Sequence, residues 1–226
     1  MAGIPLHLNP EVAAETIEPR SERRESLPLA VALVWGCGAA VLAVGLAVRF
    51  FFRIPLATLT RDPLATLEAP FYIGAISNVG VLAWAAAATI CFFTSCLLRH
   101  EAGQVAPRRF LLYFGLLTAL LLADDLFLLH EDVLYGYLRV PEVVTFGVYG
   151  LLGAIGVVRF RSVIRGTDVL LLGMALALWC LSLLSDLMPD ARAQHLVEDG
   201  AKLVGILAWL AYLARASATF LRRARG

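Results

Sequence analysis

Side chains that could bind a metal ion or move a proton are gathered in three short runs of this sequence. The runs supply Asp124, Asp125, His130, Glu131 and Asp132 from ADDLFLLHED, Ser182, Ser185 and Asp186 from LSLLSD, and His195, Glu198, Asp199 and Lys202 from HLVEDGAKLVG. Each run adjoins an apolar segment, and an ionised group at the centre of a membrane helix costs at least about 2.5–3.5 kcal/mol, less near the interface. A metal ion, an ion pair or protonation must therefore compensate these charges.

One interpretation of the runs is a metal site built from imidazole and carboxylate groups. Such ligands on facing helices bind zinc, or a carboxylate-rich iron or manganese pair. The candidate ligands are His130, His195, Asp125, Asp186 and Asp199, and the candidate supporting groups are Lys202, Asp124 and Ser185. A metal-bound water would be the nucleophile, with Glu198 or Glu131 as the general base. This pattern predicts a metal-dependent hydrolase acting on a membrane lipid or a lipid-linked substrate.

The same side chains leave other interpretations open. In a non-catalytic assembly or sensor subunit, Lys202 and Arg192 would simply neutralise two carboxylates as ion pairs. A redox protein would hold a carboxylate-bridged metal pair, or a haem between His130 and His195. A proton or cation pathway would exchange protons among the buried acids and Lys202. The last interpretation needs a polar track across the membrane, and the opposite halves of these segments are almost wholly apolar.

Helical spacing decides which of these groups can converge. The four groups of the last run lie at i, i+3, i+4 and i+7 from His195, so they share one helix face at about 100° per residue. Asp124 shares a face with Glu131 by the same rule. An unbroken helix puts His130 about 140° away from Asp125. His130 can therefore join the cluster only if the helix unwinds near Leu129, or if its carboxylate partner comes from another helix.

The segments that must position these groups are apolar enough for a lipid solvent. Of the 226 residues, 60% are hydrophobic and only 16% are charged, with a mean hydropathy of +0.78. A helix of about 20 apolar residues spans the hydrocarbon core of a bilayer. Six segments qualify: Leu29–Phe52, Phe71–Leu98, Phe110–His130, Val143–Phe160, Asp168–Met188 and Gly200–Leu221. We therefore predict an all-α polytopic integral membrane protein with about six transmembrane helices in one bundle.

The charged residues predict how this bundle is placed. The formal net charge of +1 argues against nucleic acid as a partner, since nucleic-acid binding needs a strongly basic surface. Basic residues gather in the two tails and in the second and fourth connections, which puts both termini in the cytoplasm. We expect a cytoplasmic N-terminal tail over residues 1–27, a transmembrane domain over 28–221 and a basic tail over 222–226. One lysine against eighteen arginines suggests a GC-rich bacterial genome, and hence a bacterial inner membrane.

Overall fold

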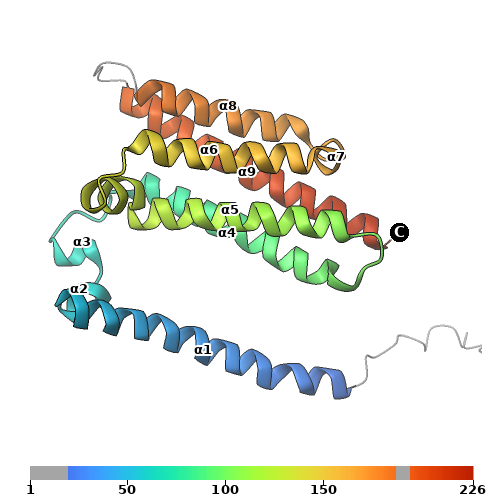
Figure 1. Cartoon of the computed structure of the whole chain (residues 1–226), viewed down its shortest axis with the longest axis horizontal. Coiled ribbons are helices and arrows are strands. Elements are labelled where there is room, and N and C mark those ends of the chain that lie inside the picture. Colours follow the sequence, from blue (N-terminus) through green and yellow to red (C-terminus); the bar gives the residue numbers. More distant parts are fainter. Residues whose placement is uncertain (1–19, 187–193, 226) are drawn as a thin grey trace, which may run out of the picture. The chain divides into compact units, whose positions relative to one another are not determined.

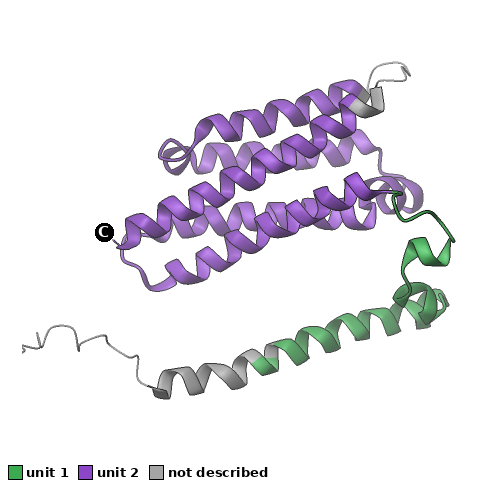
Figure 2. Cartoon of the chain, turned by 180° about the vertical axis from the view of Figure 1, so that it is seen from behind, with its two compact units in different colours: residues 1–73 green, residues 74–226 purple. Residues whose placement is uncertain are grey.

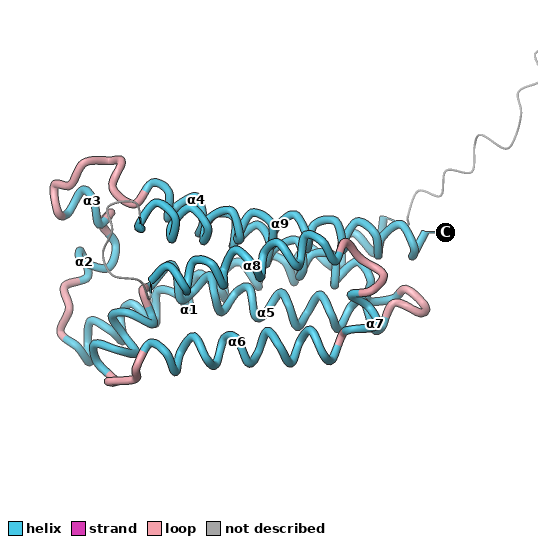
Figure 3. The backbone as a smooth tube through the Cα atoms, turned by 90° about the horizontal axis from the view of Figure 1, so that it is seen from above, coloured by secondary structure: helices cyan, strands magenta, loops and turns pink. Residues whose placement is uncertain are grey.

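Every regular element that the structure describes is a helix. The computed structural model describes the backbone of residues 20–186 and 194–225, and the side chains of residues 31, 32, 34–185 and 197–225. Short loops join the helices, as the tube in Figure 3 shows. The prediction of an all-α chain is confirmed for this part of the sequence.

The chain forms two compact units, residues 1–73 and 74–226, coloured separately in Figure 2. The first unit contains α1 (Arg20–Phe52), α2 (Leu56–Thr60) and α3 (Pro63–Thr66). Helix α1 begins inside the segment that we predicted to be a tail, because its first turns extend the apolar helix by charged residues. Within the first unit, none of the apolar stretch Val34–Phe52 is buried. Large apolar side chains of this stretch, such as Trp35, Leu42 and Phe50, are exposed.

The second unit is a bundle of long helices, seen side by side in Figure 1. Its elements are α4 (Ala75–Leu97), a 3-10 turn η2 (Leu98–His100), α5 (Val105–Phe127), a π-helical segment η3 (Leu129–Tyr137), α6 (Glu142–Arg159), α7 (Arg161–Ile164), α8 (Val169–Asp186) and α9 (Gln194–Arg225). Pro141 lies directly before α6, where a proline costs no hydrogen bond. The predicted segments therefore correspond to α1, α4, α5, α6, α8 and α9.

Five of these helices are long and apolar enough to cross a membrane, within the part of the chain that the structure describes. They contain Val34–Phe52, Ala75–His100, Val105–Phe127, Glu142–Arg159 and Val197–Arg225. In the fifth predicted segment, Asp168–Met188, the described side chains give an apolar helix over Val169–Ser185, and the last residues of that segment lie outside the described residues. The sequence predicts about six spans, and the described residues contain five candidate spans and one shorter apolar helix.

Aromatic side chains form the core of the second unit. Phe110 and Phe114 of α5 are almost fully buried, as are Trp209 and Tyr212 of α9. The Phe114 and Trp209 ring centroids are 5.5 Å apart, and the Trp209 indole N–H donates a 3.0 Å hydrogen bond to Thr118 Oγ1. The apolar stretch of α9 is 50% buried and that of α6 only 11%. Helix α9 is therefore central to this unit, and α6 lies at its edge.

Helix α6 is held against α5 by two contacts of Tyr113. A Cβ added at Gly156 would lie 2.5 Å from Tyr113 Cε1, so a larger residue here would force the rings to move. The Tyr113 hydroxyl donates a 2.7 Å hydrogen bond to the carbonyl oxygen of Leu152, one turn earlier. These two contacts hold α6 beside α5, with the α6 N-terminus next to the end of α5 and η3.

Candidate functional site

The end of α5 is broken near Leu129, which is one of the two conditions that the sequence analysis gave for His130 to join the cluster. Helix α5 stops at Phe127, and Leu128 has φ 50° and ψ 43°, a left-handed conformation that a leucine rarely adopts. The chain then continues as the π-helical segment η3 from Leu129. This interruption turns His130 back toward the last turn of α5. The predicted condition for His130 to join the cluster is therefore met.

The carboxylate that His130 reaches is Asp124, and both residues are buried. His130 Nδ1 lies 2.6 Å from Asp124 Oδ2, and the backbone N–H of His130 donates to Asp124 Oδ1 at 3.0 Å. The hydroxyl of Tyr149, on α6, donates to the same Oδ1 at 2.9 Å. Asp124 is 5% exposed and His130 8% exposed. Three donors thus compensate a carboxylate that a low-dielectric surrounding would otherwise disfavour.

The second ring nitrogen of His130, Nε2, lies near another carboxylate, that of Glu131. His130 Nε2 lies 3.3 Å from Glu131 Oε1, whose side chain is 56% exposed, and the Phe146 ring lies against the imidazole with centroids 5.0 Å apart. When Nδ1 donates its proton to Asp124, Nε2 presents a lone pair to the Glu131 carboxylate. Two electron-rich atoms at this distance repel unless a proton or a metal ion lies between them. A hydrogen bond between these two atoms therefore needs a proton on one of them.

Asp125, the next residue, has a different partner. Its Oδ1 lies 2.6 Å from Lys202 Nζ of α9, and the Asp125 side chain is 10% exposed against 45% for Lys202. A Cβ added at Gly80 of α4 would lie 3.9 Å from Asp125 Oδ2, so this ion pair is next to three helices. Consecutive helical residues point about 100° apart. Asp124 therefore belongs to one polar cluster, with His130 and Tyr149, and Asp125 to a second, with Lys202. Both clusters lie at the same end of the bundle, which we call the acidic end.

The other predicted site residues are placed only in part. Ser185 is buried, Glu198 is half-buried and Asp199 is exposed. The side chains of Asp186 and His195 lie outside the described residues. Within the described side chains, no group of three or more His, Cys, Asp or Glu could hold a metal ion. Of the predicted ligands, the described part thus brings together His130 with Asp124 and Glu131, and it pairs Asp125 with Lys202.

Sequence analysis missed two hydroxyl residues of α6. Tyr149 donates to Asp124, and Thr145, one turn earlier on the same face, is 4% exposed. The Thr145 hydroxyl has no hydrogen-bond partner among the described residues. A signal was present in the sequence, since a threonine and a tyrosine four residues apart interrupt an otherwise apolar segment.

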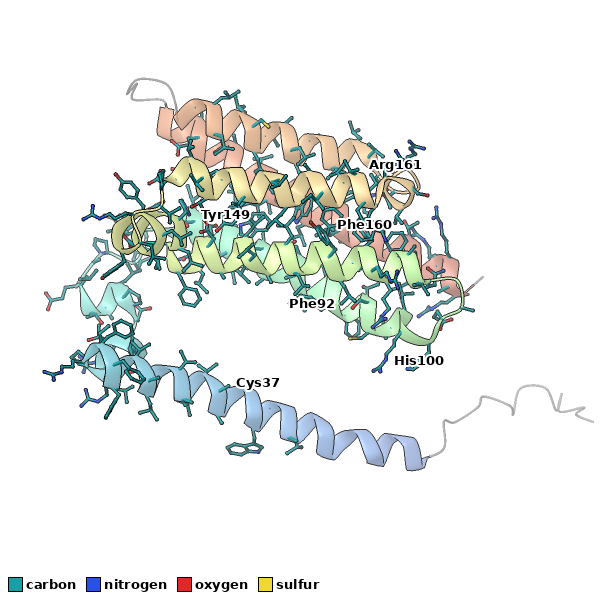
Figure 4. The ribbon with its side chains drawn as sticks, in the orientation of Figure 1. Cys37, Phe92, His100, Tyr149, Phe160 and Arg161 are labelled. Atoms are coloured by element: carbon teal, nitrogen blue, oxygen red, sulfur yellow. The ribbon has the colours of Figure 1, made fainter. Side chains whose placement is uncertain are left out.

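The opposite end of the second unit is basic, and we call it the basic end. Phe110 joins its helices, with ring centroids 5.9 Å from Phe160 and 5.7 Å from Phe220. Figure 4 labels His100 and Arg161 at this end, away from Tyr149. The arginines near these elements are Arg99, Arg108, Arg109, Arg159, Arg161, Arg165, Arg215, Arg222, Arg223 and Arg225.

The one ion pair of the basic end, among the described residues, joins Arg215 to Asp168. Arg215 Nε lies 2.6 Å from Asp168 Oδ2, and both side chains are substantially exposed. The hydrogen bond from Arg215, followed by the charges of Arg215 and Arg222, holds the pKa of Asp168 below its ordinary value. Arg223 donates a 3.1 Å hydrogen bond to the Gly166 carbonyl and ties α9 to the α7–α8 connection.

Comparison with known proteins gives a family but no activity. Residues 26–216 match a family described as a domain of unknown function, DUF8692, and the chain belongs to that family. No curated protein and no solved structure matches the chain. The match covers α4 to α8 and most of α1 and α9, so it includes both polar clusters of the acidic end.

Proposed function

We propose that this member of the DUF8692 family is a polytopic membrane protein that hydrolyses a lipid or lipid-linked substrate at one membrane face, with His130 as the general base. Support for membrane insertion comes from the five candidate spans and from the large apolar side chains exposed on α1 and α6. Such extended apolar surfaces are rare on soluble monomers.

The proposed topology has six crossings, with both termini in the cytoplasm of a bacterium. Helix α8 would be the shortest crossing, because 17 residues extend about 25 Å and the hydrocarbon core is about 30 Å thick. The arginines of the basic end support a cytoplasmic location for that end. The acidic end would then face the periplasm, and its substrate would come from the outer leaflet.

The observation that carries the hydrolytic proposal is the 2.6 Å contact between His130 Nδ1 and Asp124 Oδ2. A buried carboxylate that accepts the Nδ1 proton fixes the imidazole in one tautomer and stabilises it when it gains a proton. Nε2, which lies on the side of the ring next to the exposed Glu131, then takes a proton from water or a hydroxyl group and returns it to a leaving group. Tyr149 and the backbone N–H of His130 hold Asp124 in place for this role.

A metal-dependent version of the reaction is the second candidate, and one contact favours it. Histidines that bind metal through one ring nitrogen usually donate the other N–H to a carboxylate, as His130 does to Asp124. His130 Nε2 and Glu131 Oε1, 3.3 Å apart, would supply two ligands. The remaining ligands would come from His195, Asp186 or Asp199, since Asp125 is held by Lys202.

A matched pair of histidine variants tests the proposal. The full chain in detergent is assayed with a fluorogenic phospholipid and a fluorogenic long-chain ester in mixed micelles, and its zinc, iron and manganese content is measured. We expect His130→Gln to lower hydrolysis about 100-fold or more, as loss of a general base does. His100→Gln, at the exposed opposite end, is the control and should keep full activity.

Each outcome of this assay decides between the candidates. Stoichiometric metal that is lost in His130→Gln would favour the metal-dependent version. Full activity without bound metal would favour His130 acting alone. No hydrolysis of either probe by the wild-type chain, or unchanged hydrolysis by a folded His130→Gln variant, would contradict the proposed function.

A further inference from the structure

The basic end of the second unit carries far more positive charge than its own carboxylates can neutralise. It holds ten arginines against Glu101 and Asp168. Among the described residues, Asp168 pairs with Arg215, and the side chains of Arg161 and Arg165 are exposed. Like charges so close together repel one another. This surface is therefore suited to an anionic partner.

Two polar atoms at the start of α5 show where such a partner could be held. The Arg108 and Gln104 side chains are half-buried, and their Nε and Oε1 atoms are covered and have no hydrogen-bond partner among the described residues. The two residues lie one turn apart, since the backbone N–H of Arg108 donates to the Gln104 carbonyl at 2.9 Å. A buried donor and a buried acceptor thus lie on the same side of one helix, and each is costly to leave unpaired.

The core places this pair among the arginine-bearing elements. Phe110 follows Arg108 by two residues and is fully buried. Its ring contacts Phe160, which lies between Arg159 and Arg161, and Phe220, which lies just before Arg222 and Arg223. The start of α5 is therefore next to the α6–α7 junction and the end of α9. A group bound at Arg108 would lie among these positive charges.

We propose that the basic end binds the headgroup of an anionic phospholipid, with the phosphate accepting from Arg108 and a headgroup hydroxyl donating to Gln104. A phosphate diester matches the excess charge and the buried guanidinium N–H, and guanidinium groups are well suited to phosphate. The hydroxyl of a phosphatidylglycerol headgroup matches the second unpaired atom. Basic pockets between transmembrane helices on the cytoplasmic side bind lipid headgroups in this way. The inference rests on the proposed membrane insertion and not on the role of His130.

Lipid binding to the full chain tests this proposal. Native mass spectrometry of the detergent-solubilised protein measures binding of phosphatidylglycerol, phosphatidylcholine and phosphatidylethanol, the last of which has the phosphate but no headgroup hydroxyl. We expect phosphatidylglycerol to bind about tenfold more tightly than phosphatidylcholine, and phosphatidylethanol to bind with intermediate affinity. High salt should weaken binding of both anionic lipids.

Substitutions of Arg108 and Gln104 test the two proposed headgroup contacts separately. Arg108→Gln should remove most of the preference for phosphatidylglycerol, and Arg108→Lys should keep part of it, which separates a lost charge from a lost fold. Gln104→Leu should bring phosphatidylglycerol down to the affinity of phosphatidylethanol and leave phosphatidylethanol unchanged. Arg61→Gln, on the exposed end of α2 in the other unit, is the charge-matched control and should keep wild-type binding.

Three results would overturn the proposal. Equal binding of phosphatidylglycerol and phosphatidylcholine would show that the charge of the headgroup is not recognised. Unchanged lipid preference in Arg108→Gln would remove the assigned contact. Competition by inorganic phosphate at millimolar concentration, with the same loss in Arg108→Gln, would make a free anion the ligand. Because the readout is lipid binding, a failure of the hydrolysis assay leaves this test unaffected.

Discussion

The two ends of the second unit both carry charge, but they enclose it differently. At the acidic end, Asp124 is 5% exposed and His130 8% exposed, and three donors surround the carboxylate. At the basic end, the Asp168 and Arg215 side chains are 40% and 64% exposed. A pair in a dry surrounding depends on each partner, whereas solvent screens an exposed pair. Removing one partner of a polar contact should therefore lower the stability of the fold more at the acidic end than at the basic end.

The largest effect should follow from Asp124→Ala at the acidic end. It leaves the His130 backbone N–H, the His130 ring and the Tyr149 hydroxyl without their common acceptor. Each buried donor left without an acceptor costs about 1–3 kcal/mol, and here there are three of them. Thermal unfolding in detergent measures this cost, with Glu131→Ala as the exposed control, expected to change stability by about 1 kcal/mol or less. Equal effects of the two variants would remove the contrast.

An intermediate effect should follow from Lys202→Met, which keeps the length of the side chain and removes its charge. Asp125 then loses its 2.6 Å ion pair while its side chain stays 10% exposed. An unpaired buried acceptor costs about 1–3 kcal/mol. The double variant Lys202→Met with Asp125→Leu should recover part of this loss, because a matched apolar pair avoids the unpaired charge. Further loss in the double variant would show that Asp125 has a second partner.

The smallest effect should follow from Asp168→Asn at the basic end. The Arg215 hydrogen bond holds the pKa of Asp168 below its ordinary 3.8, so the pair stabilises the fold above that pH and loses this contribution as the pH falls through the lowered pKa. We expect a decrease in Tm within about 2 °C at neutral pH. Below the lowered pKa the variant and the wild type should unfold alike. A Tm difference that persists at that acidic pH would contradict the ion-pair explanation.

Sequence reasoning located the helices well, because the apolar segments are long and prolines separate them. It predicted Val143–Phe160, and the structure has Glu142–Arg159. Helix α1 begins at Arg20, ahead of the predicted apolar segment Leu29–Phe52, because a helix can continue through charged residues that an apolar pattern does not include. Five of the six predicted segments contain candidate spans, and the remaining one is described as an apolar helix only over Val169–Ser185.

Sequence reasoning identified the polar residues of the acidic end but could not pair them. It stated that His130 needs either a broken helix or a carboxylate from another helix. The break occurs at Leu128, a residue with no intrinsic preference for the left-handed conformation. Tertiary contacts must impose that conformation, and they cannot be read from spacing. The pairing of Asp125 with Lys202 crosses 77 positions of sequence, so it also lay beyond helical periodicity. The placement of Asp186 and His195 remains a prediction.

The sequence separations of the two acidic-end clusters also set an order of assembly. Asp124 finds its partners 6 and 25 residues later, within the hairpin formed by α5, η3 and α6. Asp125 finds its cation only 77 residues later, on the last helix. A chain synthesised from its N-terminus can thus complete the first cluster as soon as α6 is available. Asp125 has no Lys202 to pair with until α9 is synthesised. Packing of this last helix is therefore the step that completes the second cluster.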